Sequence, residues 1–152
     1  MDFVSKIVEF NEVAGNENEF DARKVALYIG LVLEEAQELI DALPHSAQIE
    51  GLGKLSTALD YYSRRFKGGE FDKDVNRINR VEALDAFVDI GVVTLGGAHA
   101  LGADVQGACH EVMDSNLSKF PIVDGKRTVI KDENGKVKKP EGYRAPELEQ
   151  YL

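Results

Sequence analysis

The sequence contains two acidic stripes, each built from three carboxylates at helical spacing: Glu34, Glu35 and Glu38 in the first, and Glu82, Asp85 and Asp89 in the second. Because each helical residue advances by about 100°, the first acidic stripe spans an arc of about 100° and the second about 60°. Carboxylates crowded on one face repel one another unless cations neutralise them. Hard oxygen ligands without a nearby histidine or cysteine cluster favour Mg²⁺, with Mn²⁺ as a substitute. The stripes therefore predict a divalent metal site.

The helices that carry these stripes are apolar at most of their other positions, so we expect both to be largely buried rather than ordinary solvated helices. Gly30 and Gly96 fall beside the stripes, where each costs about 1 kcal/mol relative to alanine in a helix interior. Small residues next to acids favour room for a ligand. Close packing of helices is the alternative explanation for the two glycines.

The periodicity of apolar residues predicts helices over residues 2–14, 22–43, 47–66, 72–101 and 105–119. Asp21, Asp72 and Asp104 are the expected N-caps of three of them. A short hairpin is expected over residues 127–138, with Asn134 and Gly135 in its turn. The sequence therefore predicts an all-α fold, a four- to five-helix bundle with a short C-terminal β-hairpin and an extended tail. We expect one domain, residues 1–152, with its helical core over 2–120 and the hairpin and tail over 121–152.

Composition limits the classes of function that this chain can have. A length of 152 residues with 43% hydrophobic residues is typical of one globular domain. The net charge of −9 argues against broad electrostatic binding of nucleic acid. The single cysteine, Cys109, excludes an intramolecular disulfide and a cysteine-rich zinc site, and its apolar neighbours predict a buried, inert thiol. With neither a signal-like N-terminus nor a membrane-length apolar segment, we expect a cytoplasmic protein that does not bind membranes.

Positive charge is concentrated near the C-terminus. Eight of the 18 basic residues follow position 118: Lys119, Lys126, Arg127, Lys131, Lys136, Lys138, Lys139 and Arg144. Acids on the helices and bases at the end of the chain would suit a site that holds both a metal and a polyphosphate. An ordinary solvated basic tail is the alternative.

The ordered motifs Glu34-Glu35-x-x-Glu38 and Glu82-x-x-Asp85 resemble the EExxE and ExxD signature of the MazG-like all-α nucleoside triphosphate pyrophosphohydrolases. This family is related to the dimeric dUTPases and to phosphoribosyl-ATP pyrophosphohydrolase. Residues 95–104, 111–120, 124–126, 133–137 and 139–146 are similar to its compact phage and bacterial branch. The resemblance covers residues 22–148, and residues 47–66 match least well.

The resemblance implies a Mg²⁺-dependent cleavage of the α–β bond of a (deoxy)nucleoside triphosphate, which yields the monophosphate and pyrophosphate. Branch-level likeness favours dGTP or GTP, and a phage-encoded member would act in the host cytoplasm. The implied catalytic residues are Glu34, Glu35, Glu38 and Asp85, and the implied metal ligands are Glu35, Glu38, Glu82, Asp85 and Asp89. Glu34 is our choice of general base, because it matches the first glutamate of the family motif. The second motif has two registers, Glu82 with Asp85 or Asp85 with Asp89, and Asp85 belongs to both.

The candidate substrate-binding residues lie late in the chain. Asn116 and Lys119, at i and i+3 on one helix, can offer an amide and an ammonium to a phosphate or sugar, although a helix cap with a dipole-compensating lysine is the alternative. The resemblance implies that Lys139 and Tyr143 close over the nucleotide. The aromatic candidates for stacking on the base are Phe3, Phe10, Phe20, Tyr61 and Tyr62.

Two other functions compete with this one. The first is a non-catalytic helical module that dimerises and binds a basic partner through its acids. The second is an enzyme with the same site that acts on a diphosphate or phosphoribosyl nucleotide. In each case the apolar surface left by a few long helices predicts burial against a second copy. We expect a homodimer, and a homotetramer also fits the family.

Overall fold

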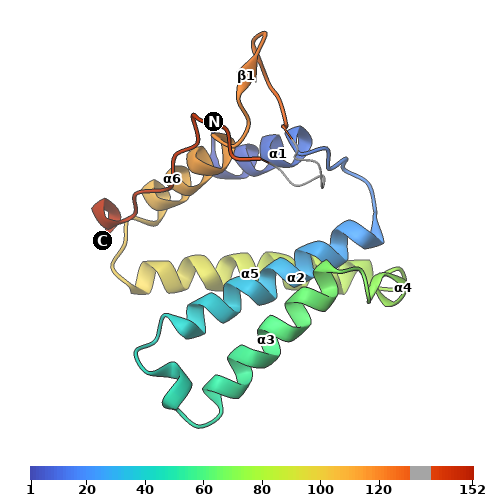
Figure 1. Ribbon diagram of the computed structural model, residues 1–152, viewed down its shortest axis with the longest axis vertical. Helices are drawn as coiled ribbons and strands as arrows, with labels where there is room; N and C mark the ends of the chain where they lie inside the picture. Colours follow the sequence, from blue (N-terminus) through green and yellow to red (C-terminus); the bar gives the residue numbers. More distant parts are fainter. Residues whose placement is uncertain (131–137) are drawn as a thin grey trace. The chain divides into compact units, whose positions relative to one another are not determined.

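The computed structural model describes residues 1–130 and 138–152, apart from the side chain of Ala47. Its elements are α1 (Phe3–Val13), α2 (Ala22–Asp41), η1 (Ser46–Gln48), α3 (Leu52–Lys67), α4 (Asp72–Val75), α5 (Arg80–Ala100), α6 (Val105–Leu117), β1 (Ile122–Val123), β2 (Lys126–Arg127) and η2 (Glu149–Tyr151) (Figure 1). The fold is all-α, with one short antiparallel hairpin in the C-terminal part of the chain, and the predicted fold class is confirmed.

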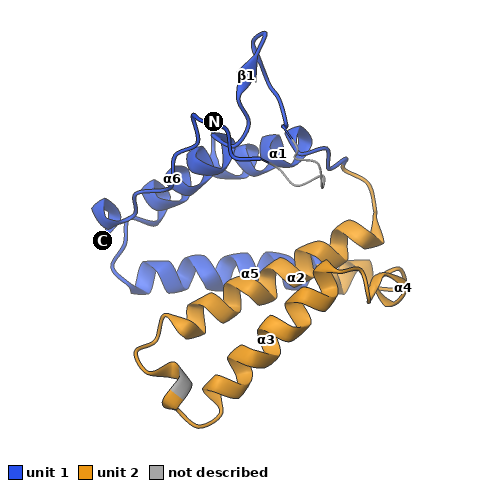
Figure 2. Cartoon of the chain, viewed as in Figure 1, with its two compact units in different colours: residues 1–17, 84–152 blue, residues 18–83 orange. Residues whose placement is uncertain are grey.

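The chain divides into two compact units (Figure 2). Unit 1 contains Met1–Glu17 and Leu84–Leu152, and unit 2 contains Asn18–Ala83. The helix α5 begins in unit 2 and continues into unit 1. The first acidic stripe therefore belongs to unit 2, whereas Asp85 and Asp89 belong to unit 1.

Unit 2 is built on an antiparallel pair of helices, α2 and α3. The α2 helix begins where Asp21 accepts hydrogen bonds from the backbone N–H groups of Arg23 and Lys24 at 2.8 and 3.1 Å, as its sequence predicts. The Arg23 guanidinium donates to the carbonyl oxygens of Phe66 and Lys67, the last residues of α3. These bonds satisfy carbonyls that a helix end leaves free, and they join the start of α2 to the end of α3.

The two helices approach closely because the residues at their crossing are small. Ala26, Gly30 and Ser63 are all buried there. A Cβ atom built on Gly30 would lie 2.9 Å from the carbonyl oxygen of Ser63 and 2.7 Å from Cγ of Lys67. The prediction that Gly30 leaves room for a ligand is therefore wrong, and close helix packing is its explanation. A Cβ on Gly96 would meet nothing within 4 Å in the described chain.

Two predicted helices are interrupted. The helix predicted over residues 47–66 becomes η1 and α3, because Gly51 takes a left-handed conformation with φ of 92° between them. The helix predicted over residues 72–101 is split into α4 and α5. Asp72 is the first residue of α4 rather than its N-cap, and α5 starts anew where the Asn79 side chain accepts from the backbone N–H groups of Val81 and Glu82.

Unit 1 has a small core between α1 and α6. The rings of Phe10 and Phe120 lie 5.0 Å apart, and Met113 and Leu117 of α6 are buried beside them in this unit. The guanidinium of Arg127 joins the hairpin to this pair, because it donates to Glu9 of α1 at 3.0 Å and to the carbonyl oxygen of Leu117 at 3.1 Å.

The hairpin forms at Ile122–Arg127, where Ile122 pairs with Arg127 and Val123 with Lys126. Its turn residues Asp124 and Gly125 have φ angles of 51° and 77°, as a type I′ turn requires. The turn predicted at Asn134 and Gly135 lies outside the described residues. Asp-Gly is as strong a turn signal as Asn-Gly, and the sequence analysis overlooked it.

The last ten residues, which we name the C-terminal strap (residues 143–152), run along α6. The buried carboxylate of Glu111 accepts from the Arg144 guanidinium at 2.6 Å and from the backbone N–H of Glu147 at 3.1 Å. The hydroxyl of Ser115 donates to the carbonyl oxygen of Arg144 at 2.8 Å. At the other end, the backbone N–H of Asp104 donates to the carbonyl oxygen of Tyr151 at 2.8 Å. Both ends of the strap are thus fixed to α6.

We expect Arg144→Met to lower the melting temperature at pH 7 and to do so much less at pH 3. The Arg144 hydrogen bond, followed by that of the Glu147 backbone, lowers the pKa of Glu111 below its usual value. A lowered folded-state pKa contributes stability at neutral pH that is lost as the pH falls through that pKa. Thermal unfolding at both pH values measures this, with Lys138→Met as the exposed control. An equal loss at both pH values would contradict the role of the charged pair.

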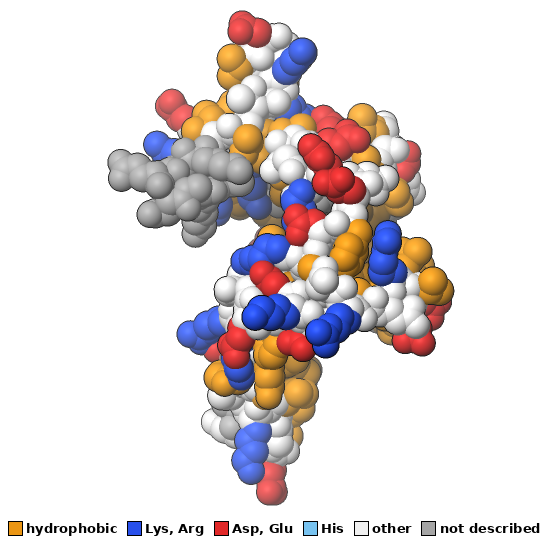
Figure 3. Space-filling view, turned by 90° about the vertical axis from the view of Figure 1, so that its right-hand side faces the viewer, with side chains coloured by type: hydrophobic (Ala, Val, Ile, Leu, Met, Phe, Trp, Pro, Cys, Tyr) orange, Lys and Arg blue, Asp and Glu red, His pale blue; other side chains and the backbone are white. Residues whose placement is uncertain are grey.

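The α5 helix differs most from expectation, since none of its residues is buried. The sequence predicts a largely buried helix, and that prediction is wrong for the single described chain. Hydrophobic side chains reach the surface beside charged ones (Figure 3). No single helix among the described residues is long and apolar enough to cross a membrane, and α5 with α6 meets that test only as a pair bent by 117°.

Candidate functional site

The first acidic stripe lies on α2, with Glu35 and Glu38 exposed and Glu34 partly covered. Glu34 Oε1 accepts a hydrogen bond from the Lys67 ammonium at 2.7 Å, so α3 supplies one cation to this stripe. Lys67 is held there by the close crossing of α2 and α3 at Gly30. One carboxylate of the three is therefore balanced by a positive charge.

The other two carboxylates of the stripe, those of Glu35 and Glu38, repel each other. The pKa of Glu35 is raised, first by partial burial of its carboxyl group and then by the charges of Glu38 and Glu34. At i and i+3 on one helix, two like charges repel each other. A cation bound between them would remove this repulsion, and the stripe has the donor chemistry for a hard divalent ion.

We expect Glu38→Gln to lower the pKa of Glu35 toward its ordinary value, because it removes the larger of the two charge contributions. For a carboxyl group whose pKa is raised by folding, stability is present at low pH and lost as the pH rises through that pKa. The variant should therefore lose less stability than the parent between pH 4 and pH 7. Carboxyl titration followed by NMR measures the pKa directly. An unchanged Glu35 titration would contradict a contribution from the charge of Glu38 to the raised pKa.

The second acidic stripe lies on α5, and all three of its side chains are exposed. Glu82 stands in the first turn of α5, where the helix dipole favours an acid. Asp85 and Asp89 follow one and two turns later. Within residues 1–130 and 138–152, no group of three or more His, Cys, Asp or Glu side chains is arranged to hold a metal ion.

The candidate substrate-binding residues form two contacting pairs in unit 1. The Lys119 ammonium donates to Asn116 Oδ1 at 2.8 Å, and Lys139 Nζ lies 4.4 Å from the centre of the Tyr143 ring. The backbone of Arg144, next to Tyr143, bonds to the Ser118 hydroxyl at 3.2 Å. Both pairs therefore gather at the C-terminal end of α6, as a shared role requires.

Two of the candidate aromatic residues, Tyr61 and Tyr62, line an open pocket of about 770 Å³ that is formed by α3 and the segment before it. Their rings meet edge to face at 5.1 Å, and the Arg65 guanidinium lies 4.9 Å from the Tyr61 ring centre. The Phe10 ring packs against Phe120 in the core of unit 1. The Arg80 guanidinium lies 5.0 Å from the centre of the Phe20 ring. Of these four, the two tyrosines alone stand at a described pocket.

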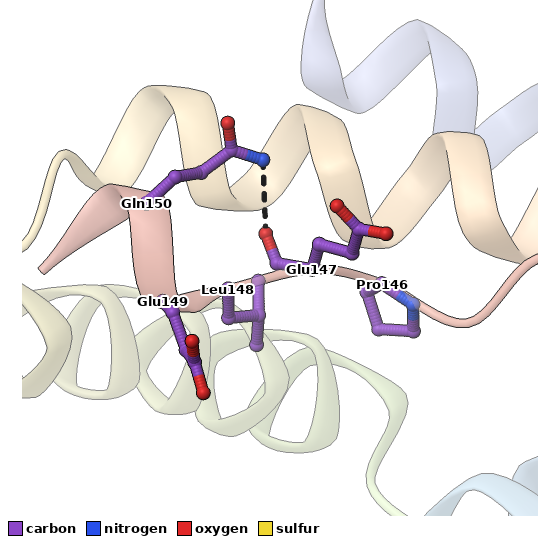
Figure 4. Close-up of a pocket in the computed structure, with 5 residues that line it drawn as sticks. All are labelled: Pro146, Glu147, Leu148, Glu149 and Gln150. Carbon is purple, nitrogen blue, oxygen red and sulfur yellow. Dashed lines mark hydrogen bonds between the residues drawn. The ribbon is translucent and has the colours of Figure 1, made fainter.

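Another pocket, of about 720 Å³, is lined by Pro146 to Gln150 of the C-terminal strap (Figure 4). The Gln150 amide folds back to donate to the Glu147 carbonyl oxygen at 3.1 Å, and Glu149 points away from that bond. None of the predicted site residues lines this pocket. Its side chains offer no basic group for a phosphate.

Cys109 on α6 is partly buried, and burial raises the pKa of its thiol. A raised pKa leaves less of the reactive thiolate at neutral pH. This agrees with the expectation of an inert thiol, although the side chain is not fully buried.

Two charged residues have partners that the sequence does not reveal: Lys67, which was not among the candidates, and Arg144, which was named for its positive charge alone. Lys67 pairs with Glu34 across 33 positions of sequence, and Arg144 pairs with Glu111 across the same separation. No local spacing rule connects residues so far apart. The sole hint was the position of Lys67 in the last turn of a helix that must return alongside α2.

Comparison of the chain with protein-family models, with curated proteins and with solved structures found no match.

Proposed function

We propose that this protein is a Mg²⁺-dependent nucleoside triphosphate pyrophosphohydrolase that cleaves the α–β bond of a (deoxy)nucleoside triphosphate. The products are the monophosphate and pyrophosphate, and dGTP or GTP is the favoured substrate. The proposal places the enzyme in the cytoplasm as a homodimer or homotetramer, with Mn²⁺ able to replace Mg²⁺. It rests on the resemblance of the two acidic stripes to the MazG-like signature.

The observation that carries the proposal is the charge state of the first acidic stripe. Lys67 balances Glu34, whereas no ion pair with Glu35 or Glu38 is found among residues 1–130 and 138–152, and the pKa of Glu35 is raised. A face on which three carboxylates share one paired ammonium supports a role in binding a further cation.

The donor set fits a hard divalent cation, because every candidate ligand is a carboxylate oxygen. The carboxylates proposed to bind such a cation are Glu35 and Glu38 of the first stripe and Glu82, Asp85 and Asp89 of the second. When bound, the cation neutralises phosphate charge and makes water easier to deprotonate.

The other residues then have roles that follow from their chemistry. Glu34 would take a proton from the water that attacks the α-phosphorus, while the bond to the bridging oxygen breaks and pyrophosphate leaves. Asn116 and Lys119 would bind phosphate or sugar oxygens through an amide and an ammonium. Lys139 and Tyr143, which already contact each other, would close over the nucleotide.

The proposal is tested by measuring pyrophosphate and orthophosphate released from eight nucleoside triphosphates with Mg²⁺, Mn²⁺ or EDTA. We expect pyrophosphate, dependent on the metal, from a subset of the panel that includes the guanine nucleotides. Glu35→Gln should lose this activity, whereas Glu19→Gln, an exposed acid before α2 in the same unit, should keep it.

Other results would redirect the proposal in defined ways. Orthophosphate as the first product would contradict cleavage at the α–β bond. Activity confined to diphosphate or phosphoribosyl nucleotides would favour the alternative substrate class. No release from any nucleotide, with no binding of Mg²⁺, would favour the non-catalytic helical module.

A further inference from the structure

Arg144 is the residue through which α6 holds the start of the C-terminal strap. Its backbone N–H donates to the Ser118 hydroxyl at 3.2 Å, and its carbonyl oxygen accepts from the Ser115 hydroxyl at 2.8 Å. Its guanidinium donates to the two carboxylate oxygens of Glu111 at 2.6 and 3.4 Å. The backbone and the side chain of one residue are therefore both fixed by α6.

The three residues of α6 that hold Arg144 form a well-ordered platform. They are four and three positions apart in sequence, so they share one face of the helix. Glu111 and Ser115 are buried, at 9% and 3% exposed, and the Ser118 hydroxyl donates to the Ser115 carbonyl oxygen at 2.6 Å. The platform and the strap both belong to unit 1.

The contacts of Arg144 extend to the candidate substrate-binding residues Tyr143 and Lys139. Tyr143 directly precedes Arg144, and its backbone N–H donates to the Pro140 carbonyl oxygen at 3.0 Å, which closes a four-residue turn. The turn brings Lys139 back over the Tyr143 ring, with its ammonium 4.4 Å from the ring centre. One series of contacts therefore leads from Glu111 through Arg144 to both side chains.

We propose that Glu111 is a positioning residue, which acts through Arg144 to hold Tyr143 and Lys139 where they close over the nucleotide. This inference rests on the proposed function, in which those two side chains bind the substrate. The Glu111 carboxylate is buried against the strap and acts on the substrate through them. Side chains that are held in place before binding lose less conformational entropy when the nucleotide arrives.

A direct contact between Arg144 and phosphate is the alternative, because the Arg144 side chain is 50% exposed. The two roles predict opposite effects of neutralising Glu111. If Arg144 bound phosphate, the change would free its guanidinium and remove a negative charge, so an anionic nucleotide should bind more tightly. In the positioning role, the change releases Tyr143 and Lys139, and the nucleotide should bind more weakly. The donation of both Nη atoms to Glu111 favours positioning.

The first test is the steady-state kinetics of Glu111→Gln on the nucleotide that the parent protein cleaves fastest. We expect KM to rise by about five- to tenfold, with kcat within about twofold of the parent value. A merely structural defect would lower the amount of active enzyme, and therefore kcat, while KM stayed the same. An unchanged or lowered KM would overturn the proposal.

The matched control is Glu149→Gln, which also removes one acid and lies in the same strap. Glu149 is exposed, and its side chain points away from the bond between Gln150 and Glu147 (Figure 4). We expect its KM and kcat to equal those of the parent. A rise in KM equal to that of Glu111→Gln would show that any lost acid has this effect, and the positioning role would be excluded.

A double-mutant cycle identifies the residues through which Glu111 acts. We expect Lys139→Ala with Tyr143→Ala to raise KM. Adding Glu111→Gln to that variant should raise KM no further, because the side chains that Glu111 positions are then absent. A further increase would mean that Glu111 acts on the substrate by another route, contrary to the proposal.

The last test needs no nucleotide, so it separates failure of this inference from failure of the proposed function. The Lys139 methylene protons next to the ammonium lie near the Tyr143 ring, and the ring should displace their NMR shifts upfield. We expect Glu111→Gln to return these shifts toward those of an unstructured lysine, and Glu149→Gln to preserve them. If the parent protein cleaves no nucleotide but the shifts change as expected, the proposed function fails and the positioning of the two side chains stands.

Ser115→Ala provides a second variant in case Glu111→Gln fails to fold. It keeps the charge of Glu111 and removes one hydrogen bond to the backbone of Arg144. We expect the Lys139 shifts to move in the same direction and by a smaller amount. Circular dichroism identifies which variants are folded, and unchanged Lys139 shifts in a folded variant at either position would overturn the proposal.

Discussion

Replacing Asp85 by asparagine is expected to abolish metal-dependent pyrophosphate release, with a loss in kcat/KM of at least about 100-fold. Asp85 belongs to both registers of the second acidic motif, so its role does not depend on whether Glu82 or Asp89 completes the pair. The amide keeps the size of the side chain but removes the charge that would hold a cation. The assay is pyrophosphate release at saturating Mg²⁺ on the nucleotide that the parent protein cleaves fastest.

The variant should retain its fold, because Asp85 is exposed on α5 and forms no ion pair that the structure describes. Substitution at such a position usually changes the free energy of unfolding by less than about 0.5 kcal/mol. Circular dichroism and thermal unfolding check this point. The matched control is Asp124→Asn in the hairpin turn, where asparagine tolerates the left-handed backbone. Full activity in the Asp85 variant would remove this residue from the metal site.

The parts of the fold that local chemistry controls could be predicted from the sequence. Asp21 and Asp104 cap α2 and α6 as expected, because an aspartate before an apolar periodic segment satisfies free N–H groups wherever the rest of the chain lies. Asp2 caps α1 in the same way. These signals need no tertiary information, so the predicted starts of α1, α2 and α6 agree with the structure to within one residue.

Interruptions of helices were harder to predict because two signals competed. Asp72 and Asn79 are both good capping residues, and the apolar period continues past both of them. With Asp72 taken as the N-cap, the apolar period predicts one continuous helix. In the structure, Asn79 instead caps the start of α5. Likewise Gly51 is compatible with a weak helix or with the left-handed turn that it forms.

The candidate site shows a different limit of sequence reasoning. Periodicity places Glu34, Glu35 and Glu38 on one face of α2, and the structure has them there. Periodicity cannot say which cation from another helix balances them, and Lys67 was missed for that reason. Nor can it say what buries an apolar helix. The apolar pattern on α5 predicts a largely buried helix, but none of its residues is buried in the described chain.

Gly30→Ala is expected to destabilise unit 2 although alanine is the better helix former. The added methyl group would stand 2.9 Å from the carbonyl oxygen of Ser63, which is backbone of α3 and cannot rotate away. Overpacking of this kind costs about 1–3 kcal/mol, and the gain in helix propensity returns about 1 kcal/mol. We therefore expect a net loss of up to about 2 kcal/mol in the free energy of unfolding, and a larger loss for Gly30→Val.

The control for this prediction is Gly97→Ala in α5, where the same added methyl group would meet nothing within 4 Å. Alanine at position 97 should raise stability by as much as about 1 kcal/mol through helix propensity alone. Urea unfolding of both variants, followed by circular dichroism, gives the two free energies. Opposite signs would establish that the α2–α3 crossing is as close as described. Because the same crossing holds Lys67 beside Glu34, Gly30→Ala should also disturb the charge balance of the first acidic stripe. A stabilised Gly30→Ala protein would mean that the two helices do not cross so closely, and the pairing of Lys67 with Glu34 would lose its structural basis.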